Sequence, residues 1–351
     1  MIMIMITHTI YGGLGNQLYQ IFTTIALAIR CADTCVFHRR PPPPQPPGQI
    51  EASGVATRIT HWDTIFANLA PYVRSTDPAE DATDGIYRYS QPSHAYTPIE
   101  FPQSKLHLNP HSSLYVIDGY FQSYKYFDRE FDTICRYLDI EGQRAQICEW
   151  IRPHPVLGSF AGPIVDQCPS TDNSCVRVAM HFRIGDYKTL SHHHPIMPAQ
   201  YYERALTALL KSMEESESEV HIYLFYDTSE EPEVTPIVAH LQQRIVCPPG
   251  IKLQYHHVPP QITQDASMLE HDCRCMTDPE HLLLMSMCTH FIIANSTFSL
   301  WAAHFSNFPS SGRRPPSKVY YPSVWFGRAL QSTHDVRDMF PKEWIRIDAQ
   351  A

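Results

Sequence analysis

The run at residues 181–187 (HFRIGDY) places Arg183 and Asp186 directly after a predicted strand. In open α/β sheets, ligands bind at the carboxyl ends of the strands. A planar guanidinium at that edge can hold a phosphate through two parallel charge-assisted hydrogen bonds. Asp186 can hold Arg183 in place or accept a hydrogen bond from a sugar hydroxyl. The run therefore indicates an anion site, although a structural Arg–Asp surface pair accounts for the same residues.

A second run at residues 295–299 (NSTFS) gathers hydroxyl groups between a predicted strand and a predicted helix. Ser296 and Thr297 can donate to a phosphate there, while the helix N-terminus adds its partial positive charge. N-capping of the helix explains the same residues without a ligand. The first three residues also match a glycosylation sequon. We set the sequon aside because an apolar strand leads straight into it and no secretory signal is recognisable.

A third run at residues 12–17 (GGLGNQ) connects a predicted strand to a predicted helix. Gly13 and Gly15 let the backbone approach a ligand, and the helix N-terminus offers free N–H groups to anions. Packing of a tight turn, with no ligand, is the alternative. A dinucleotide-binding fingerprint requires glycine where this chain has Leu18, so the pattern argues against an NAD-dependent oxidoreductase.

Two histidine-containing segments have ligand types that bind metals but lack the spacing of a metal site. Residues 192–194 are three consecutive histidines, which in a loop are usually solvated. His271, Cys273, Cys275 and His281 do not follow the usual spacing of zinc ligands. We therefore expect no bound metal.

The three runs need strands that end beside one another, and the hydrophobic pattern supplies them. The chain opens with a predicted strand at 1–6, followed by a helix whose apolar face runs from Leu18 to Ile29 and a strand at 34–38. Further strands are predicted at 114–117, 176–180, 220–226 and 291–294, with helices at 126–152 and 198–213 between them. Asp278 is predicted to N-cap another helix that has Pro279 at its first position. Strands alternating with helices indicate an α/β protein with parallel sheets.

Two segments interrupt this pattern. The proline-rich stretch at 41–48 cannot be a helix or sheet interior, and is either a stiff surface insertion or a ligand for a proline-binding domain. Residues 153–174 are rich in proline, glycine, serine and aspartate, which indicates a domain boundary. We expect an N-terminal domain at 1–160 and a C-terminal domain at 161–351, with the last helix packing back on the first domain.

The composition fits a globular enzyme. Apolar residues make up 43% of the 351 residues and charged residues 18%, and the net charge of −9 argues against a nucleic-acid partner. No stretch is long and apolar enough for a transmembrane segment. The ten cysteines form no regular framework, so reduced thiols in a soluble, cytoplasmic protein are expected.

Taken in order, the runs resemble the family-11 glycosyltransferases, whose typical members are α-1,2-fucosyltransferases. The family's G-G-L-G-N-Q-[ML]-[FY]-Q is matched at 12–20, and its G-Y-F-Q-S-x-K-Y-F at 119–127 with Tyr124 at the variable position. Its H-V-R-R-G-D-Y is matched at 181–187 with two changes, and its M-S-x-C-x-H-x-I-I-A-N-S-[ST]-F-S at 285–299. The resemblance spans most of the chain.

This resemblance implies a GT-B type α/β fold, in which two Rossmann-like domains face each other across a cleft. It also implies roles for the residues of the runs. Arg183 would bind the pyrophosphate of GDP-fucose, with Asp186 beside it as a second catalytic candidate, either orienting the arginine or acting as the base. Donor contacts are expected from Gly13, Gly15, Asn16, His181, Asp278, Asn295, Ser296, Thr297 and Phe298. Acceptor contacts are expected from Gln122 and Tyr124.

The implied reaction inverts the anomeric centre, giving an α-linked product from GDP-β-L-fucose. It needs no cofactor, and the sequence contains no Asp-x-Asp, the usual magnesium or manganese holder of the other large glycosyltransferase fold. Two departures from the family pattern remain. Ile184 replaces the second arginine of the R-R pair, and residues 300–304 (LWAAH) replace W-W-G-A-W. A fucosyltransferase of another linkage or acceptor, a transferase that uses another GDP-sugar, and a non-catalytic sugar-nucleotide or glycan-binding module therefore stay open.

Overall fold

The computed structural model describes residues 4–39, 58–76, 85–100, 113–161, 175–213, 218–258, 261–262, 274–309 and 317–350. Its contacts divide the chain into two compact units. The first unit comprises Met1–Ile140 with Thr333–Pro341, and the second Glu141–Ser332 with Lys342–Ala351. The boundary thus lies at 140/141, not at 160/161 as the composition suggested. The proline-rich stretch at 41–48 lies outside the described residues.

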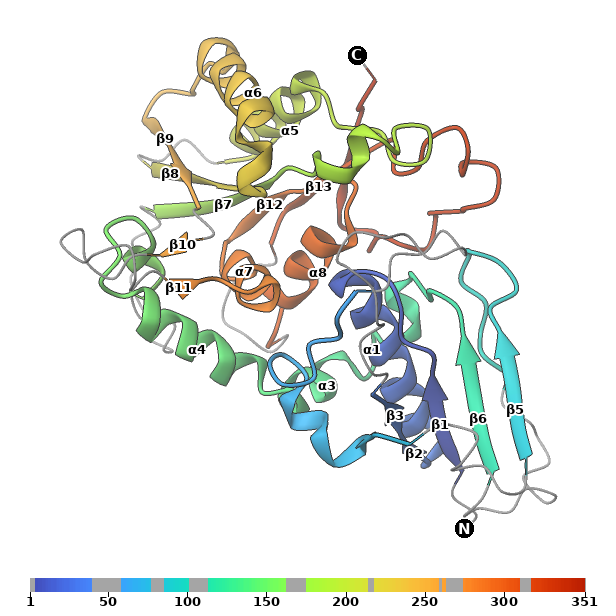
Figure 1. The fold of residues 1–351 in the computed structure, drawn as a ribbon. Helices are drawn as coiled ribbons and strands as arrows, with labels where there is room; N and C mark the ends of the chain where they lie inside the picture. Colours follow the sequence, from blue (N-terminus) through green and yellow to red (C-terminus); the bar gives the residue numbers. More distant parts are fainter. Residues whose placement is uncertain are drawn as a thin grey trace. The chain divides into compact units, whose positions relative to one another are not determined.

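The first unit is built on a parallel sheet with the strand order β2-β1-β6-β5 (Figure 1). Its strands are β1 (Met5–His8), β2 (Thr34–Cys35), β5 (Gly85–Ser90) and β6 (Ser113–Asp118). A second parallel pair joins β3 (Phe37–His38) to β4 (Val73–Arg74). The helical elements are α1 (Leu14–Cys31), η1 (Ala67–Tyr72), η3 (Tyr124–Tyr126) and α3 (Phe131–Tyr137). The predicted strands at 34–38 and 114–117 are confirmed, the first of them in two short pieces.

Helix α1 buries most of the face that its apolar spacing predicts. Leu18, Ile21 and Phe22 are fully buried, whereas Ile29, which was predicted to face inward, is 46% exposed. The helix ends at Ala32, which adopts a left-handed conformation and donates its N–H to the last-turn carbonyls.

The predicted helix at 126–152 is two helices in the structure, because Asp139 adopts φ 55° and ends the first of them. The second, α4 (Ile140–Ile151), belongs almost entirely to the second unit. Its Arg144 is buried and donates to Ser286 Oγ and to the carbonyl oxygens of Phe305 and Phe308, at distances of 2.6–3.1 Å. These bonds explain why the unit boundary precedes α4 and does not follow it.

The second unit is built on a six-stranded, wholly parallel sheet with the order β14-β13-β12-β7-β8-β9. Its strands are β7 (Cys175–His181), β8 (Ser218–Phe225), β9 (Ile251–His257), β12 (His290–Ile292), β13 (Val319–Pro322) and β14 (Ile345–Ile347). A short antiparallel pair joins β10 (Gln261–Ile262) to β11 (Arg274–Cys275). Short helical turns are η4 (Leu157–Ala161), η5 (Gly185–Lys188) and η6 (Thr228–Glu230).

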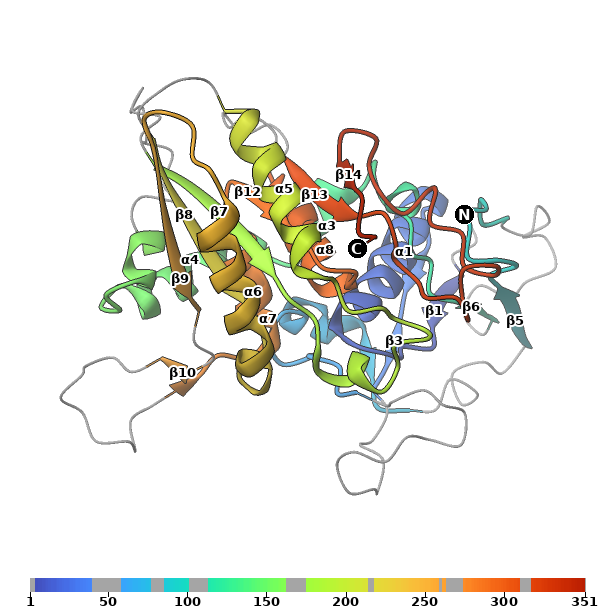
Figure 2. The ribbon, with the colours of Figure 1, turned by 90° about the horizontal axis from the view of Figure 1, so that it is seen from above.

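Helices cover both faces of this sheet. Helices α5 (Ala199–Lys211) and α6 (Glu231–Arg244) lie on one face, and α7 (Asp278–Met285) and α8 (Thr297–Ser306) on the other (Figure 1). Figure 2 shows α5 and α6 from above, running roughly along the direction of β8 and β9. Alternate strand residues such as Val178 and Met180 join the side chains of α5 in one buried core. The α/β class predicted from the sequence is therefore confirmed, since each unit has a parallel sheet with flanking helices.

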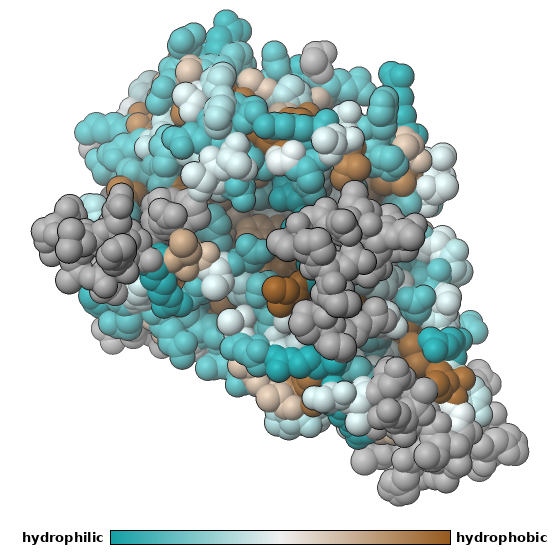
Figure 3. All heavy atoms as spheres, viewed as in Figure 1, coloured by the Kyte–Doolittle hydropathy of each residue, from teal (hydrophilic) through white to brown (hydrophobic). Residues whose placement is uncertain are grey.

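The described segment at 333–341 groups with the first unit although it follows the second in sequence. It contains no helix, so the prediction that a helix returns to the first domain is wrong in its secondary structure. No helix among the described residues is long and apolar enough to cross a membrane. On the face drawn in Figure 3, most of the described surface is hydrophilic and the hydrophobic residues form small separate groups.

Candidate functional site

Two of the three sequence runs meet at one edge of the six-stranded sheet. Strands β7 and β12 are parallel neighbours, with Ile292 in register with Met180, so the segments that follow the two strands leave the sheet at the same edge. The Tyr187 hydroxyl donates to the Asn295 carbonyl oxygen at 3.1 Å, which joins the run after β7 to the run after β12. The rings of His181 and Phe298 stack with their centroids 5.8 Å apart. The edge therefore brings the predicted arginine loop beside the predicted hydroxyl turn.

Arg183 is held in this edge by its own loop. Its Nη2 donates to Asp186 Oδ1 at 2.6 Å, and its guanidinium lies 5.3 Å from the ring centroid of Tyr187. The Arg183 side chain keeps 27% of its exposure and that of Asp186 keeps 41%, so the guanidinium is restrained but accessible. This arrangement suits an arginine that is oriented by a carboxylate and turned toward an anionic ligand.

The hydroxyl turn begins helix α8. Ser296 is the N-cap, and its Oγ accepts from Phe298 N at 3.3 Å, so the capping that the sequence allowed is present. That bond uses Ser296 Oγ as an acceptor and leaves its O–H to donate elsewhere. Asn295 serves the scaffold, since its Nδ2 donates to the carbonyl oxygens of Pro195 and Trp325, both at 3.0 Å. Thr297 is half-buried at the first helical position.

At this edge His181 is buried and His281 is half-buried, and both are neutral at pH 7. Burial, with smaller contributions from Arg183 and His281, lowers the pKa of His181 to about 3. Burial also lowers the pKa of His281 to about 4, against the opposing effect of Asp278 and Asp227. Among the described residues, His181 Nδ1 and His281 Nε2 have no hydrogen-bond partner. The edge thus presents uncharged imidazole nitrogens beside a cationic guanidinium.

Sequence reasoning missed three residues of this edge. Asp227 follows β8, and the Ser229 hydroxyl and N–H that bond its carboxylate lower its pKa, with a smaller contribution from Arg183. Glu230 is buried and accepts from the N–H groups of Ile184 and Gly185. His281 was considered only as a zinc ligand. A signal for Asp227 was available, because it directly follows the predicted strand at 220–226.

The predicted donor contact Asp278 lies in the first turn of α7, but it is not the N-cap. Thr277 is the N-cap, and it forms a capping box in which its Oγ1 accepts from Glu280 N while the Glu280 side chain accepts from Thr277 N. The prediction that Asp278 caps this helix is therefore wrong. Its acidic side chain still lies near His281.

The third run lies in the first unit and is shaped by its own glutamines. Gly12 adopts φ 80°, and a Cβ there would lie 2.9 Å from Asn16 Nδ2, so only glycine fits this turn. Gln17 Nε2 donates to the Gly12 carbonyl oxygen at 2.9 Å, and Tyr11 N donates to Gln20 Oε1 at 3.0 Å. Both glutamines are fully buried. They hold the glycine turn, while Gly13 precedes the first residue of α1 as its N-cap.

The predicted acceptor contact Gln122 is bonded to the predicted donor contact Asn16. Gln122 Nε2 donates to Asn16 Oδ1 at 2.8 Å, and Gln122 Oε1 lies 2.9 Å from Nε2 of His94. The ring of His94 packs against that of His334, with centroids 4.7 Å apart. Tyr124 is half-buried in η3. The structure therefore joins Gln122 to the glycine run, and it adds His94 and His334, which sequence reasoning missed.

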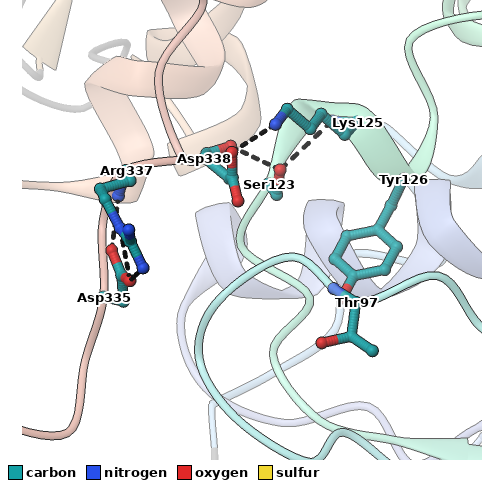
Figure 4. A network of polar contacts seen from close by, with 7 residues as sticks. All are labelled: Thr97, Ser123, Lys125, Tyr126, Asp335, Arg337 and Asp338. Carbon is teal, nitrogen blue, oxygen red and sulfur yellow. Dashed lines mark hydrogen bonds and ion pairs between the residues drawn. The ribbon is translucent and has the colours of Figure 1, made fainter.

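The segment at 333–341 is fastened beside this network, as Figure 4 shows. Asp338 accepts from the Lys125 ammonium through its carboxylate and from Ser123 Oγ through its carbonyl oxygen. Arg337 pairs with Asp335, whose carbonyl oxygen lies 3.0 Å from His94 Nδ1. On the other side, Thr97 N donates to the Tyr126 hydroxyl at 3.0 Å.

The histidines and cysteines considered as metal ligands do not gather in the described part of the chain. No group of three or more histidine, cysteine, aspartate or glutamate side chains that could hold a metal is found there. His194 stacks on Tyr187 with centroids 4.8 Å apart, which gives that histidine a packing role. Cys275 is exposed on β11, and His271 and Cys273 lie outside the described residues.

In sequence, the chain is similar to a glycosyltransferase. The chain is 24% identical over 215 residues to the O-antigen biosynthesis glycosyltransferase WbnK of Escherichia coli. That match covers 60% of this chain and 55% of WbnK, so the chain spans about half the length of this relative. No protein-family model matches the chain.

Solved structures of fucosyltransferases are similar at low identity. A mutant of Arabidopsis thaliana FUT1 in complex with GDP is 10% identical with a TM-score of 0.42, covering 97% of this chain and 75% of FUT1. Fucosyltransferase NodZ from Bradyrhizobium is 14% identical with a TM-score of 0.39, covering 86% and 92% of the two chains. POFUT1 in complex with GDP is 11% identical with a TM-score of 0.42, covering 91% and 98%. Because these scores lie below 0.5, the fold described above rests on this chain's own strands and helices.

Proposed function

We propose that this protein is an inverting glycosyltransferase that moves L-fucose from GDP-β-L-fucose to a hydroxyl of an acceptor glycan. The observation that carries the proposal is the meeting of the loop that contains Arg183 with the N-terminus of α8 at one sheet edge. A guanidinium and a helix N-terminus together suit a diphosphate. The similarity to WbnK supports sugar transfer, and the family-11 resemblance supports an α-1,2 linkage to galactose.

In the proposed reaction, an acceptor hydroxyl oxygen bonds to the anomeric carbon of fucose as the bond from that carbon to the β-phosphate oxygen breaks. The electron pair of the broken bond stays on GDP, whose charge grows in the transition state, and the proton of the acceptor hydroxyl passes to water or to a carboxylate acting as base. Arg183 and the N–H groups and hydroxyls at Ser296 and Thr297 would stabilise that charge. No metal is needed in this scheme, because a fixed guanidinium and a helix dipole do the same electrostatic work.

The buried edge supplies the neighbouring donor contacts. We propose that His181 and Phe298, whose rings stack, border the guanosine side, and that Asp278 lies beside it on α7. The neutral state of His181 suits recognition of an uncharged base, since its nitrogen can donate or accept without adding charge. Asn295 would act indirectly, because its amide N–H groups already bind two carbonyl oxygens.

Asp186 has two proposed roles, and the geometry favours one of them. Its carboxylate is already bonded to Arg183 at 2.6 Å, which supports an orienting role and makes Asp186 a poor base while that bond holds. Gly13, Gly15 and Asn16 as donor contacts, and Gln122 and Tyr124 as acceptor contacts, stay predictions for the first unit. The hydrogen bond between Asn16 and Gln122 shows that changing one of them will disturb the other.

The proposal is tested first by binding and then by turnover. A thermal-shift panel of GDP, GDP-fucose, UDP and NAD should give stabilisation by the two guanine nucleotides alone. Release of GDP from GDP-fucose, with a terminal β-galactoside as acceptor and EDTA present, should then show multiple turnovers. Stabilisation by GDP without turnover on any acceptor in a glycan panel would indicate a binding module. Loss of turnover in EDTA that manganese restores would refute the metal-independent mechanism.

A further inference from the structure

Glu230 is a buried carboxylate that accepts two hydrogen bonds from the loop after Arg183. Only 1% of it is exposed, and its Oε1 accepts from Ile184 N at 2.9 Å and from Gly185 N at 2.6 Å. Its Oε2 accepts from Asp227 N at 3.1 Å and closes the capping box at η6. The cap alone needs one oxygen, so the second oxygen is available for the loop.

The loop side of this contact is tight. A Cβ at Gly185 would lie 3.0 Å from Glu230 Oε1, which is tighter than most Cβ contacts. An alanine at residue 185 would therefore displace the carboxylate from the two amides by a few tenths of an ångström. Ile184, one of the two residues bonded to Glu230, has its side chain buried in the hydrophobic core, which fixes the loop from its other side.

The two bonded amides belong to the residues directly after Arg183. The Arg183 guanidinium is hydrogen-bonded to Asp186, whereas the backbone directly after Arg183 is hydrogen-bonded to Glu230. Leaving-group stabilisation requires the guanidinium to be placed before the charge develops, because a loose donor has to be reorganised during the reaction. The position of the guanidinium relative to the N-terminus of α8 therefore depends on the Glu230 contact.

We propose that Glu230 is a positioning residue for sugar transfer, acting through the backbone of the Arg183 loop; this inference rests on the proposed function. In Glu230→Gln one acceptor oxygen becomes an NH₂ group, which is a donor. The single remaining oxygen cannot accept from both the loop and the cap. Loss of hydrogen bonds to a charged group should lower kcat by about 10- to 100-fold. The Kd for GDP should rise by less, about five-fold at most, because ground-state binding demands less exact placement.

A double-mutant cycle with Arg183→Ala separates positioning from stability. If Glu230 acts through Arg183, adding Glu230→Gln to Arg183→Ala should change kcat by less than about three-fold, because the group that it positions is gone. A purely structural glutamate would give the full loss in both backgrounds, and that outcome would overturn the inference. Glu203→Gln is the control, since Glu203 is a partly buried carboxylate that pairs with His240 in the same unit, away from the loop.

Two further readouts keep the test decisive if Glu230→Gln is unstable. Gly185→Ala keeps the Glu230 carboxylate and crowds only its contact with the loop, so it should lower kcat in the same direction as Glu230→Gln but by less. Amide hydrogen exchange at Ile184 and Gly185 should accelerate in the folded variants while the rest of the sheet edge stays protected. Wild-type kcat in both variants, with an active wild-type enzyme, would overturn the positioning role alone. An inactive wild type that binds no GDP would instead overturn the proposed function and the positioning role together.

Discussion

Replacing Arg183 by alanine gives the most direct measure of leaving-group stabilisation. A unit charge about 4 Å from the departing phosphate, at an effective dielectric constant of about 20, is worth about 4 kcal/mol, or roughly a thousandfold in rate. The structure reduces that figure, because Asp186 lies 2.6 Å from the guanidinium and 27% of the arginine side chain stays exposed. We therefore expect kcat for GDP-fucose turnover to fall by about 10²–10³.

The assay is continuous detection of GDP release under saturating acceptor, with the GDP Kd measured by calorimetry. Arg204→Ala is the matched control, because Arg204 is an exposed arginine of α5 that donates to Asp348 and Gln350 of the same unit. The control should keep wild-type kcat, and both variants should keep the wild-type melting temperature to within a few degrees. An Arg183→Ala enzyme that turns over within a few-fold of wild type refutes the leaving-group role.

Three other expectations follow from named contacts. The pKa values of His181 (about 3) and His281 (about 4) lie below the ordinary 6.5, so the unfolded chain binds more protons than the folded protein below pH 6.5. The free energy of unfolding should therefore fall on acidification, by roughly 2 kcal/mol per histidine at pH 5. Urea titrations at pH 7 and pH 5 should show a smaller drop for His281→Asn than for the wild type. Arg144→Met removes hydrogen bonds to Ser286 and to the carboxyl end of α8 and should cost about 3 kcal/mol in urea denaturation, whereas Arg152→Met, at an exposed arginine, should cost less than about 0.5 kcal/mol. Asp186→Asn should lower kcat by about tenfold with the pH–rate profile unchanged, since the carboxylate orients Arg183; loss of about a thousandfold together with the acidic limb of the profile would show that Asp186 is the base.

Much of the second unit could be predicted because its signals are local. The strands at 176–180, 220–226 and 291–294 and the helix at 198–213 follow from hydrophobic periodicity, and the structure confirms them within a few residues. Their parallel alternation with helices then predicts that strand ends share an edge. The proximity of the loop at 181–187 to the turn at 295–299 follows from that rule, which needs no knowledge of side-chain contacts.

What could not be predicted depends on contacts between distant residues. Asp139 breaks a periodic helix by adopting a left-handed conformation, and nothing in the apolar spacing marks that position. The boundary at 140/141 follows from the bonds of Arg144 to residues more than 140 positions away. The segment at 333–341 belongs to the first unit, where Asp338 pairs with Lys125. No local sequence pattern predicts that this late segment contacts residues of the first unit.

The departure at Ile184 is explained by where this side chain lies. Ile184 is 3% exposed and packs in the core that includes Phe182 and Tyr202, so in this chain residue 184 adds no charge to the sheet edge. Arg183 is then the cation on which the proposed stabilisation of the leaving group depends. Two carboxylates restrain it from different sides, Asp186 at the guanidinium and Glu230 at the backbone. This restraint matters more because residue 184 is not an arginine, so no guanidinium at that position can compensate when Arg183 is misplaced.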